Sequence, residues 1–191
     1  MVNKLTFEQE NFFDNMIYKF IDTHLHKYYE LGITPNMVTT MSLATGCFAA
    51  YLITKNKFTE AGLLSIISYY LDCVDGKLAR KYNMVTVFGD YYDHFSDITK
   101  ILLILFALYK NDSNTFKKVI LILIPLFILS MYHIGCQQTL YPQETTESPT
   151  IDIFKSTKES CIKNIYQTKF FGLGTFNLVF AIIIIFWNKL S

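Results

Sequence analysis

The feature that most restricts how this chain can fold is a series of long stretches that contain no charged residue. Residues 36–54 form one such stretch, and residues 119–135 and 170–187 form two more. A helix that crosses a bilayer needs about 20 consecutive, predominantly apolar residues. Charged residues make up only 17% of the chain, whereas soluble domains carry about 25%. The sequence therefore predicts a helical protein that crosses a membrane several times.

Two further segments approach spanning length. Residues 61–71 and 101–109 are apolar but short, and each borders an acidic stretch. If each helix continues through the neighbouring acidic residues, both are long enough to cross, which gives five spans. Residues 139–168 are too polar to predict a sixth span, and a short span hidden among them stays an open alternative.

Single residues add expectations about the last two spans. Pro125 lies inside the stretch 119–135 and predicts a kink, which membrane helices tolerate. Trp187 and Lys189 follow the last apolar stretch and predict an anchor at the membrane interface.

The segment before the first span is amphipathic. Within residues 7–31, apolar side chains recur at helical spacing and charged residues lie between them. We expect a helix that lies along the membrane surface; the alternative is a helix packed on a soluble core. The apolar positions are Phe13, Met16, Ile17, Phe20, Ile21, Leu25 and Tyr28.

Net charge and cysteine spacing restrict the function further. A net charge of +1 gives no electrostatic argument for binding nucleic acid. The four cysteines are far apart and form no CxxC pair, so the sequence predicts neither a zinc site nor a disulfide framework. They are Cys47, Cys73, Cys136 and Cys161.

Five aspartates are concentrated between residues 72 and 97 of this apolar chain. On a helix, Asp72 and Asp75 share one face, and Asp90, Asp93 and Asp97 share another. One ionised aspartate at the centre of a bilayer costs about 2.5–3.5 kcal/mol, so five need a compensating charge. Hard oxygen ligands at this density favour Mg²⁺, Mn²⁺ or Ca²⁺ over Zn²⁺. Because Mg²⁺ commonly binds substrate phosphates as well, the cluster indicates a phosphate ester or diphosphate substrate.

Arg80 is the only arginine in the chain, and it lies within the acidic stretch. Its planar fork binds phosphate in a way that lysine cannot copy. Gly76 and Ala79 lie on the same side of the expected helix as Asp72 and Asp75, where small side chains let a ligand or a neighbouring helix approach closely.

These residues together resemble the signature of the CDP-alcohol phosphatidyltransferases. The pattern is Asp72-x2-Asp75-Gly76-x2-Ala79-Arg80-x8-Gly89-x3-Asp93-x3-Asp97, with every fixed position filled. Upstream, ITPNMVTTMSL (residues 33–43) is similar to the Pro-Asn-x-x-Thr entry into the first span of that family. The resemblance covers residues 33–97 well, and beyond them it consists only of apolar spans. Six spans are usual for the family, so the count of five is a departure that bears on the acceptor pocket.

The resemblance implies a metal-dependent transfer. Asp72, Asp75 and Asp93, with Asp97 beside them, would hold one or two Mg²⁺ or Mn²⁺ ions that clamp the diphosphate of a CDP-linked donor. Asp97 would also be the general base on the acceptor hydroxyl, and CMP would leave. The nucleotide and diphosphate site would be shaped by Gly76, Ala79 and Arg80.

His94 lies close to Asp97 around a helix and is a candidate to share in proton transfer. The alternative is a supporting or interfacial histidine. Asp90 is outside the family pattern; it is either an extra ligand or, as we favour, a charge suited to a helix start.

Donor and acceptor stay open at this stage. The donor is either CDP-diacylglycerol, with an inositol-like polar alcohol as acceptor, or CDP-choline or CDP-ethanolamine, with diacylglycerol as acceptor. The local sequence around Lys77 and the Asp93–His94 pair resembles the second group, whereas the chain length resembles the first. Since no arginine is left outside the motif for a second phosphate, an unphosphorylated acceptor is favoured.

Other classes are weaker alternatives. A membrane cation channel or carrier explains the carboxylates but not Arg80, Gly76 and Gly89. An inactive scaffold paralogue has no need to keep so many costly acids, and a prenyl diphosphate enzyme needs its acidic motifs in a different pattern.

We therefore expect one all-α domain over residues 1–191, a polytopic membrane bundle of five to six spans. Residues 1–32 form the surface helix, residues 33–110 the catalytic core spans and residues 117–191 the C-terminal spans. The expected partners are the CDP-linked donor, the acceptor alcohol and membrane lipids, without nucleic acid, and a homodimer is possible. The positive-inside rule places the active site on the cytosolic side, because the basic loops near Lys81 and Lys163 lie there.

Overall fold

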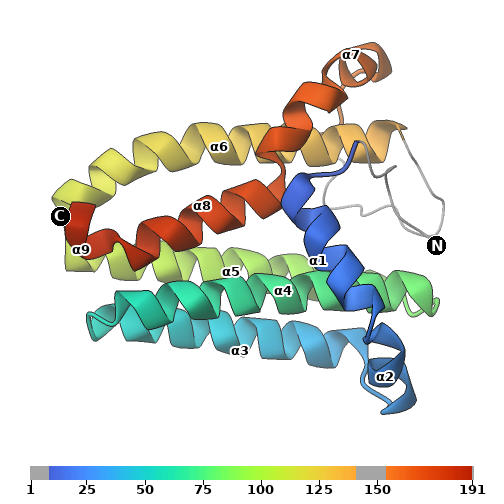
Figure 1. The fold of residues 1–191 in the computed structure, drawn as a ribbon, viewed down its shortest axis with the longest axis horizontal. Coiled ribbons are helices and arrows are strands. Elements are labelled where there is room, and N and C mark those ends of the chain that lie inside the picture. Colours follow the sequence, from blue (N-terminus) through green and yellow to red (C-terminus); the bar gives the residue numbers. More distant parts are fainter. Residues whose placement is uncertain (1–8, 141–153, 191) are drawn as a thin grey trace.

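Three long helices, of which the middle one in sequence runs opposite to the other two, form the centre of the structure, a computed structural model that describes residues 9–140 and 154–190. They are α3 (Pro35–Thr54), α4 (Phe58–Lys81) and α5 (Val87–Asn111), and α3 packs against both of the others. Above this layer in Figure 1 lie α6 (Ser113–Leu140) and α8 (Leu173–Ile185), with α8 in contact with α4. The predicted all-α bundle is confirmed.

The shorter helices lie at the two ends of the bundle (Figure 1). Near the start of α3 lie α1 (Phe12–Asp22) and α2 (Leu25–Glu30), and α7 (Lys158–Thr168) with the 3₁₀ turn η2 (Lys169–Phe171) leads into α8. At the opposite end, α9 (Trp187–Leu190) closes the described chain. We call the end with α1, α2 and α7 the site end and the end with α9 the far end.

Local sequence signals set the helix boundaries at the site end. Thr34 caps α3, accepting a hydrogen bond from the main-chain N–H of Met37, and Pro35 occupies the first turn, where its missing N–H costs nothing. Thr86 caps α5 in the same way, accepting from Gly89. At the end of α4, Asn83 takes a left-handed conformation with φ 54°, which asparagine tolerates better than most residues.

Among the described residues, fewer helices qualify as membrane spans than the five to six that the sequence predicts. By length and composition, three helical stretches can cross a membrane: Pro35–Thr54, Ser113–Leu140 and Lys158–Ile185. The acid-bearing helices α4 and α5 have spanning length, with 24 and 25 residues, but they are not among the three stretches that are also apolar enough. The count of five to six spans stays a prediction. The open question of a sixth span falls partly on residues 141–153, outside the described residues. The part that is described, α7, has 11 residues and is too short to span.

The fourth span contains Pro125 within a single helix, and Figure 1 shows that this helix, α6, is bowed along its length.

The amphipathic N-terminal segment forms two helices, α1 and α2, rather than one. Phe12, Met16 and Phe20 lie along one side of α1 and are 61%, 56% and 63% exposed. Large apolar side chains that face outward suit a helix at a membrane surface. Ile21 and Leu25, from the same predicted stripe, are buried against α4 instead. The stripe therefore divides between an outward and an inward face.

A buried lysine fastens α1 to α4. Lys77 donates to the main-chain oxygen of Tyr18 at 2.8 Å and forms an ion pair with Asp22 at 2.6 Å. The local sequence around Lys77 resembles the CDP-choline and CDP-ethanolamine group, but in the structure this lysine binds α1.

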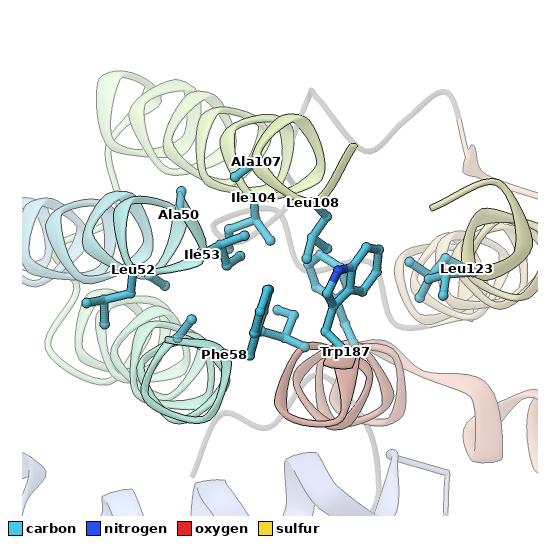
Figure 2. Close-up of a cluster of buried hydrophobic side chains, with 14 of the residues drawn as sticks. Ala50, Leu52, Ile53, Phe58, Ile104, Ala107, Leu108, Leu123 and Trp187 are labelled. Atoms are coloured by element: carbon cyan, nitrogen blue, oxygen red, sulfur yellow. The ribbon is translucent and has the colours of Figure 1, made fainter. Parts of the chain in front are cut away.

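The far end is packed with apolar side chains from α3, α4, α5 and α8 (Figure 2). Trp187 is fully buried there, near Phe58, and its ring N–H donates to the Asn111 side chain at 2.9 Å. The expectation that Trp187 is an interfacial anchor is wrong, because the end of α8 turns it into the bundle. Figure 2 labels Ala50, Leu52, Ile53, Phe58, Ile104, Ala107, Leu108, Leu123 and Trp187.

One pair of cysteines also departs from the prediction. Cys136 of α6 and Cys161 of α7 form a disulfide across 25 residues of sequence. The bond is possible because α7 folds back on the end of α6.

Candidate active site

Two acidic helix faces meet at the site end. Asp72 and Asp75 come from α4 and Asp93 from α5, and one oxygen of each lies within 4.8 Å of the others. Helical spacing is a local property and placed Asp72 and Asp75 on one face of α4. The packing of both α4 and α5 against α3 then brings the acidic faces of the two helices together. Three of the predicted ligands are therefore neighbours in space.

Asp75 is held in position by the first span. The hydroxyl of Thr39 on α3 donates to Asp75 Oδ2 at 2.7 Å, and both residues are only 3% exposed. Thr39 is the threonine of the Pro35-Asn36-x-x-Thr39 stretch. The upstream part of the sequence pattern thus has a physical role, since it fixes a carboxylate of the cluster.

The cluster fits a hard divalent cation. Asp93 Oδ1 is buried and has no hydrogen-bond partner among the described residues. A buried carboxylate oxygen without a donor is costly, and a metal ion would satisfy it. Oxygen ligands alone favour Mg²⁺ or Mn²⁺ over Zn²⁺.

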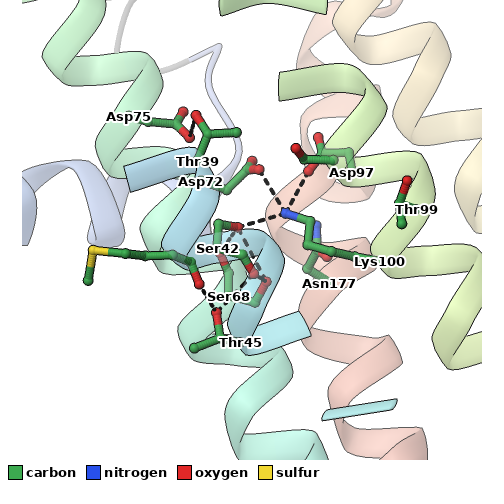
Figure 3. Close-up of polar contacts among 12 residues, drawn as sticks. Thr39, Ser42, Thr45, Ser68, Asp72, Asp75, Asp97, Thr99, Lys100 and Asn177 are labelled. Carbon is green, nitrogen blue, oxygen red and sulfur yellow. Dashed lines mark hydrogen bonds and ion pairs between the residues drawn. The ribbon is translucent and has the colours of Figure 1, made fainter. Parts of the chain in front are cut away.

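Asp97 lies beside the cluster but has a different partner. Its Oδ1 forms an ion pair with Lys100 of the same helix at 2.7 Å, and Lys100 also reaches Asp72 Oδ1 at 3.1 Å (Figure 3). The three converging acids do not include Asp97. Its predicted roles as base and ligand stay predictions.

The glycine, alanine and arginine of the pattern form the end of α4. The Arg80 guanidinium lies over Gly76: a Cβ built on Gly76 would be 3.1 Å from an Arg80 nitrogen. The absence of a side chain at position 76 therefore lets the arginine fold back toward the acids. The main-chain oxygen of Ala79 accepts from Met84 at 2.8 Å, which closes the last turn of α4.

His94 and Asp90 interact with each other at the start of α5. His94 Nδ1 lies 2.8 Å from the main-chain oxygen of Asp90 and 3.8 Å from its carboxylate. Asp90 lies in the first turn of α5, where an acid is favourable to the helix dipole. The share of His94 in proton transfer stays a prediction.

A second group of buried acids lies at the N-terminal end of α1 and contacts α4, α6 and α8. Glu10 accepts from the side chain of Gln137 at 2.8 Å, and Asp14 accepts from the Tyr69 hydroxyl and from the main-chain N–H of Gly174. Burial, and next the charge of Asp14, raise the pKa of Glu10 to about 7. Burial likewise raises the pKa of Asp14 to about 6.

Sequence reasoning missed several residues of the site. Lys100 lies at the border of an apolar stretch, one turn after Asp97. That spacing alone could have predicted an ion pair between the two side chains. Thr39 belongs to the stretch that resembles the family, but the resemblance assigns it no role. Ser42, which accepts from Lys100 at 2.7 Å, gave no signal, because its partner is 58 residues away.

Comparison with known proteins supports this assembly of residues. A family model described as CDP-alcohol phosphatidyltransferase matches residues 32–190. The chain is 33% identical over 78 residues to "Archaetidylinositol phosphate synthase" of Pyrococcus horikoshii, covering 41% of this chain and 42% of that protein. It is 34% identical over 100 residues to "Probable CDP-diacylglycerol--inositol 3-phosphatidyltransferase 2" of Arabidopsis thaliana, covering 51% and 44%.

The match thus spans less than half the length of either curated relative. No solved structure matches the chain at a significant level.

Proposed function

The chain belongs to the CDP-alcohol phosphatidyltransferase family, and from that premise we propose that it is an integral-membrane phosphotransferase of phospholipid synthesis. It transfers a phosphatidyl group from CDP-diacylglycerol to a polar alcohol of the inositol type and releases CMP. The observation that carries the proposal is the convergence of Asp72 and Asp75 with Asp93 from a different helix, within 4.8 Å.

The choice of donor and acceptor is supported by the relatives. Both have names that refer to inositol lipids, and one name specifies CDP-diacylglycerol as donor. The alternative donors, CDP-choline and CDP-ethanolamine, rested on Lys77 and His94. Lys77 is engaged with α1, and His94 is directed toward Asp90. Neither contact supports a role in recognising an aminoalcohol.

Asp72, Asp75 and Asp93 would hold the divalent ion, Mg²⁺ or Mn²⁺, on which the family depends. When bound, the ion would neutralise negative charge on the leaving phosphate. Thr39 keeps Asp75 oriented for this role through its hydrogen bond, as supporting donors commonly do for metal ligands.

Asp97 and Arg80 supply the remaining chemistry. The acceptor hydroxyl oxygen forms a bond to the phosphorus distal to cytidine, the bond from that phosphorus to the bridging oxygen breaks, and CMP leaves with that oxygen. Asp97 takes the proton of the hydroxyl, and Lys100 provides the counter-charge for its ionised form. Arg80 offers its planar fork to the diphosphate.

The site end would face the cytosol. Basic residues of the α4 terminus and of α7, such as Lys81 and Lys163, lie at this end, which agrees with the positive-inside rule. A test is protection of an epitope fused to the N-terminus in sealed membrane vesicles of known sidedness. An epitope on the lumenal or external side would refute this orientation.

The activity is tested with the full chain in lipid nanodiscs and Mn²⁺ or Mg²⁺. CDP-diacylglycerol, CDP-choline and CDP-ethanolamine are each combined with inositol, inositol phosphate, serine, glycerol phosphate and diacylglycerol. CMP release and the mass of the lipid product are recorded. We expect CMP only with CDP-diacylglycerol, and the largest signal with inositol.

The Asp93→Asn variant should abolish that signal, while Lys110→Gln, an exposed change on the same helix, should keep it. Release of CMP from CDP-choline with diacylglycerol would move the protein to the other donor class. No CMP with any pair would refute the enzymatic proposal.

A further inference from the structure

Lys100 is a buried cation inside the acidic site, and the family pattern gives it no role. It is 7% exposed and lies on α5, one turn after Asp97. Its ammonium contacts Asp97 Oδ1 at 2.7 Å, Asp72 Oδ1 at 3.1 Å and Ser42 Oγ at 2.7 Å. Figure 3 shows these three contacts converging on the ammonium from α5, α4 and α3. An ammonium offers three N–H donors, so each contact can use one.

The neighbouring helices are shaped to accommodate this side chain. Lys100 passes over Gly46 of α3, where a Cβ would lie 2.6 Å from Lys100 Cγ and 2.8 Å from its Cδ. One turn earlier on α3, Ser42 is fully buried and also donates to the main-chain oxygen of Ser68 on α4 at 2.8 Å. Burying an ammonium costs several kcal/mol unless its partners are well placed. Here two carboxylates and a hydroxyl are in place.

The four acids of the site form two overlapping groups that share Asp72. Asp72, Asp75 and Asp93 share one point, whereas Asp97 is paired with the ammonium. Asp72 takes part in both groups, which its two oxygens permit. Where two metal ions share a site they lie about 3.5–4 Å apart, so a second ion would need the oxygens of Asp97 and Asp72 that Lys100 already contacts.

We propose that Lys100 takes the place of a second divalent ion, so that the site binds a single ion, at Asp72, Asp75 and Asp93. The ammonium supplies a fixed positive charge between Asp72 and Asp97. It also acts as a positioning residue, because it holds the Asp97 carboxylate beside the ion site. The inference rests on the proposed function in that the ion belongs to the transfer reaction.

The charges of the site agree with this assignment. Four ionised aspartates bring four negative charges. One divalent ion and Lys100 offset three of them, and Arg80 adds a further positive charge where it folds over Gly76. A second divalent ion next to Lys100 would instead place two cations within contact distance in a medium of low dielectric constant, where like charges repel strongly.

The experiment counts bound Mn²⁺ on the full chain in nanodiscs, by electron paramagnetic resonance and by metal analysis after gel filtration. We expect the wild type to bind one ion with the spectrum of an isolated Mn²⁺. Lys100→Gln should bind two, with the broadening caused by spin coupling between close ions. Lys100→Arg, which keeps the charge, should stay at one, and so should the exposed control Lys110→Gln.

The wild-type count needs no variant, so the test does not depend on Lys100→Gln folding. Two coupled ions in the wild type would overturn the inference, and so would a single ion in a folded Lys100→Gln protein. CMP release is measured in parallel. Two ions with normal CMP release would remove only this inference, whereas one ion without CMP from any donor would remove the proposed function and leave the single-ion site standing.

Discussion

The two ends of the same three helices are packed in opposite ways. At the far end, α3, α4 and α5 meet through apolar side chains such as Ala49, Ile53, Phe58 and Leu108. At the site end they meet through carboxylates, hydroxyls and one ammonium (Figure 3). The helices are continuous, so the packing of one end fixes the geometry of the other.

We infer that the far end mainly stabilises the fold, whereas the site end carries the groups that take part in the reaction. Apolar contacts at the far end need no specific partner atoms, and side chains there contribute to stability through packing. The polar groups at the site end must each be matched with a partner, because an unmatched buried charge is expensive. We therefore expect changes at the site end to reduce the rate of transfer and changes at the far end to reduce the stability of the fold.

Among changes that leave the three ion-binding aspartates in place, the largest effect is expected for Asp97→Asn. Loss of a general base lowers rates by about 10²–10⁴-fold, while the far-end packing keeps the fold. The measurement is CMP release per folded molecule, with thermal unfolding recorded on the same sample. Asp90→Asn, about two turns earlier on the same helix and outside the family pattern, is the matched control and should stay within a few-fold of wild type. Equal rates for Asp97→Asn and wild type would contradict the base assignment.

Trp187→Ala should produce the converse result. Removing a large buried aromatic side chain costs about 3–5 kcal/mol of unfolding free energy, and Trp187 also loses its hydrogen bond to Asn111. Denaturation in detergent micelles should show the loss, with unchanged CMP release per folded molecule at low temperature. The neighbouring Phe186→Ala removes an exposed ring and should cost little. A stable Trp187→Ala protein with low activity would contradict the separation of the two ends.

Thr39→Val tests the contact between the first span and the cluster. Valine keeps the shape but leaves Asp75 Oδ2 without its donor. Loss of such a supporting contact lowers metal affinity or activity by about 10–100-fold. A Mn²⁺ titration of CMP release should show a higher metal requirement. Thr40→Val, on the exposed side of α3, should behave as wild type; the same shift in both variants would refute the assignment.

The smallest effect is expected for pH, which should change how tightly α1 docks on the bundle. The pKa values of Glu10 and Asp14 are raised from 4.5 and 3.8 to about 7 and about 6 in the folded protein. The folded state therefore binds protons more tightly, and this stabilisation is full below about pH 4 and lost as pH rises to about 7. Docking of α1 should weaken over this range.

Hydrogen–deuterium exchange of residues 11–22, corrected for the intrinsic rate, is the measurement for this prediction. Protection should fall between pH 5 and pH 8 in the wild type and fall less in Glu10→Gln, since an amide does not ionise. Glu30→Gln, on the exposed face of α2, should follow the wild type. Protection that rises with pH would contradict the sign of the effect.

The sequence by itself determined the helices and their acidic faces. The uncharged stretches, the caps at Thr34 and Thr86 and the spacing of Asp72 and Asp75 are local properties, and the structure follows them closely. The spacing of Asp93 and Asp97 also placed both on the side of α5 that faces the cluster. These features were predictable because helical periodicity and capping depend on residues within a few turns of each other.

Only the tertiary structure decided which groups meet across helices. The pairing of Lys100 with Ser42, of Thr39 with Asp75 and of Cys136 with Cys161 joins residues 58, 36 and 25 positions apart. Each depends on how far one helix is shifted and rotated against the next, which the packing of the whole bundle sets. The burial of Trp187 has the same origin, because the turn at the end of α8 directs it inward rather than toward lipid.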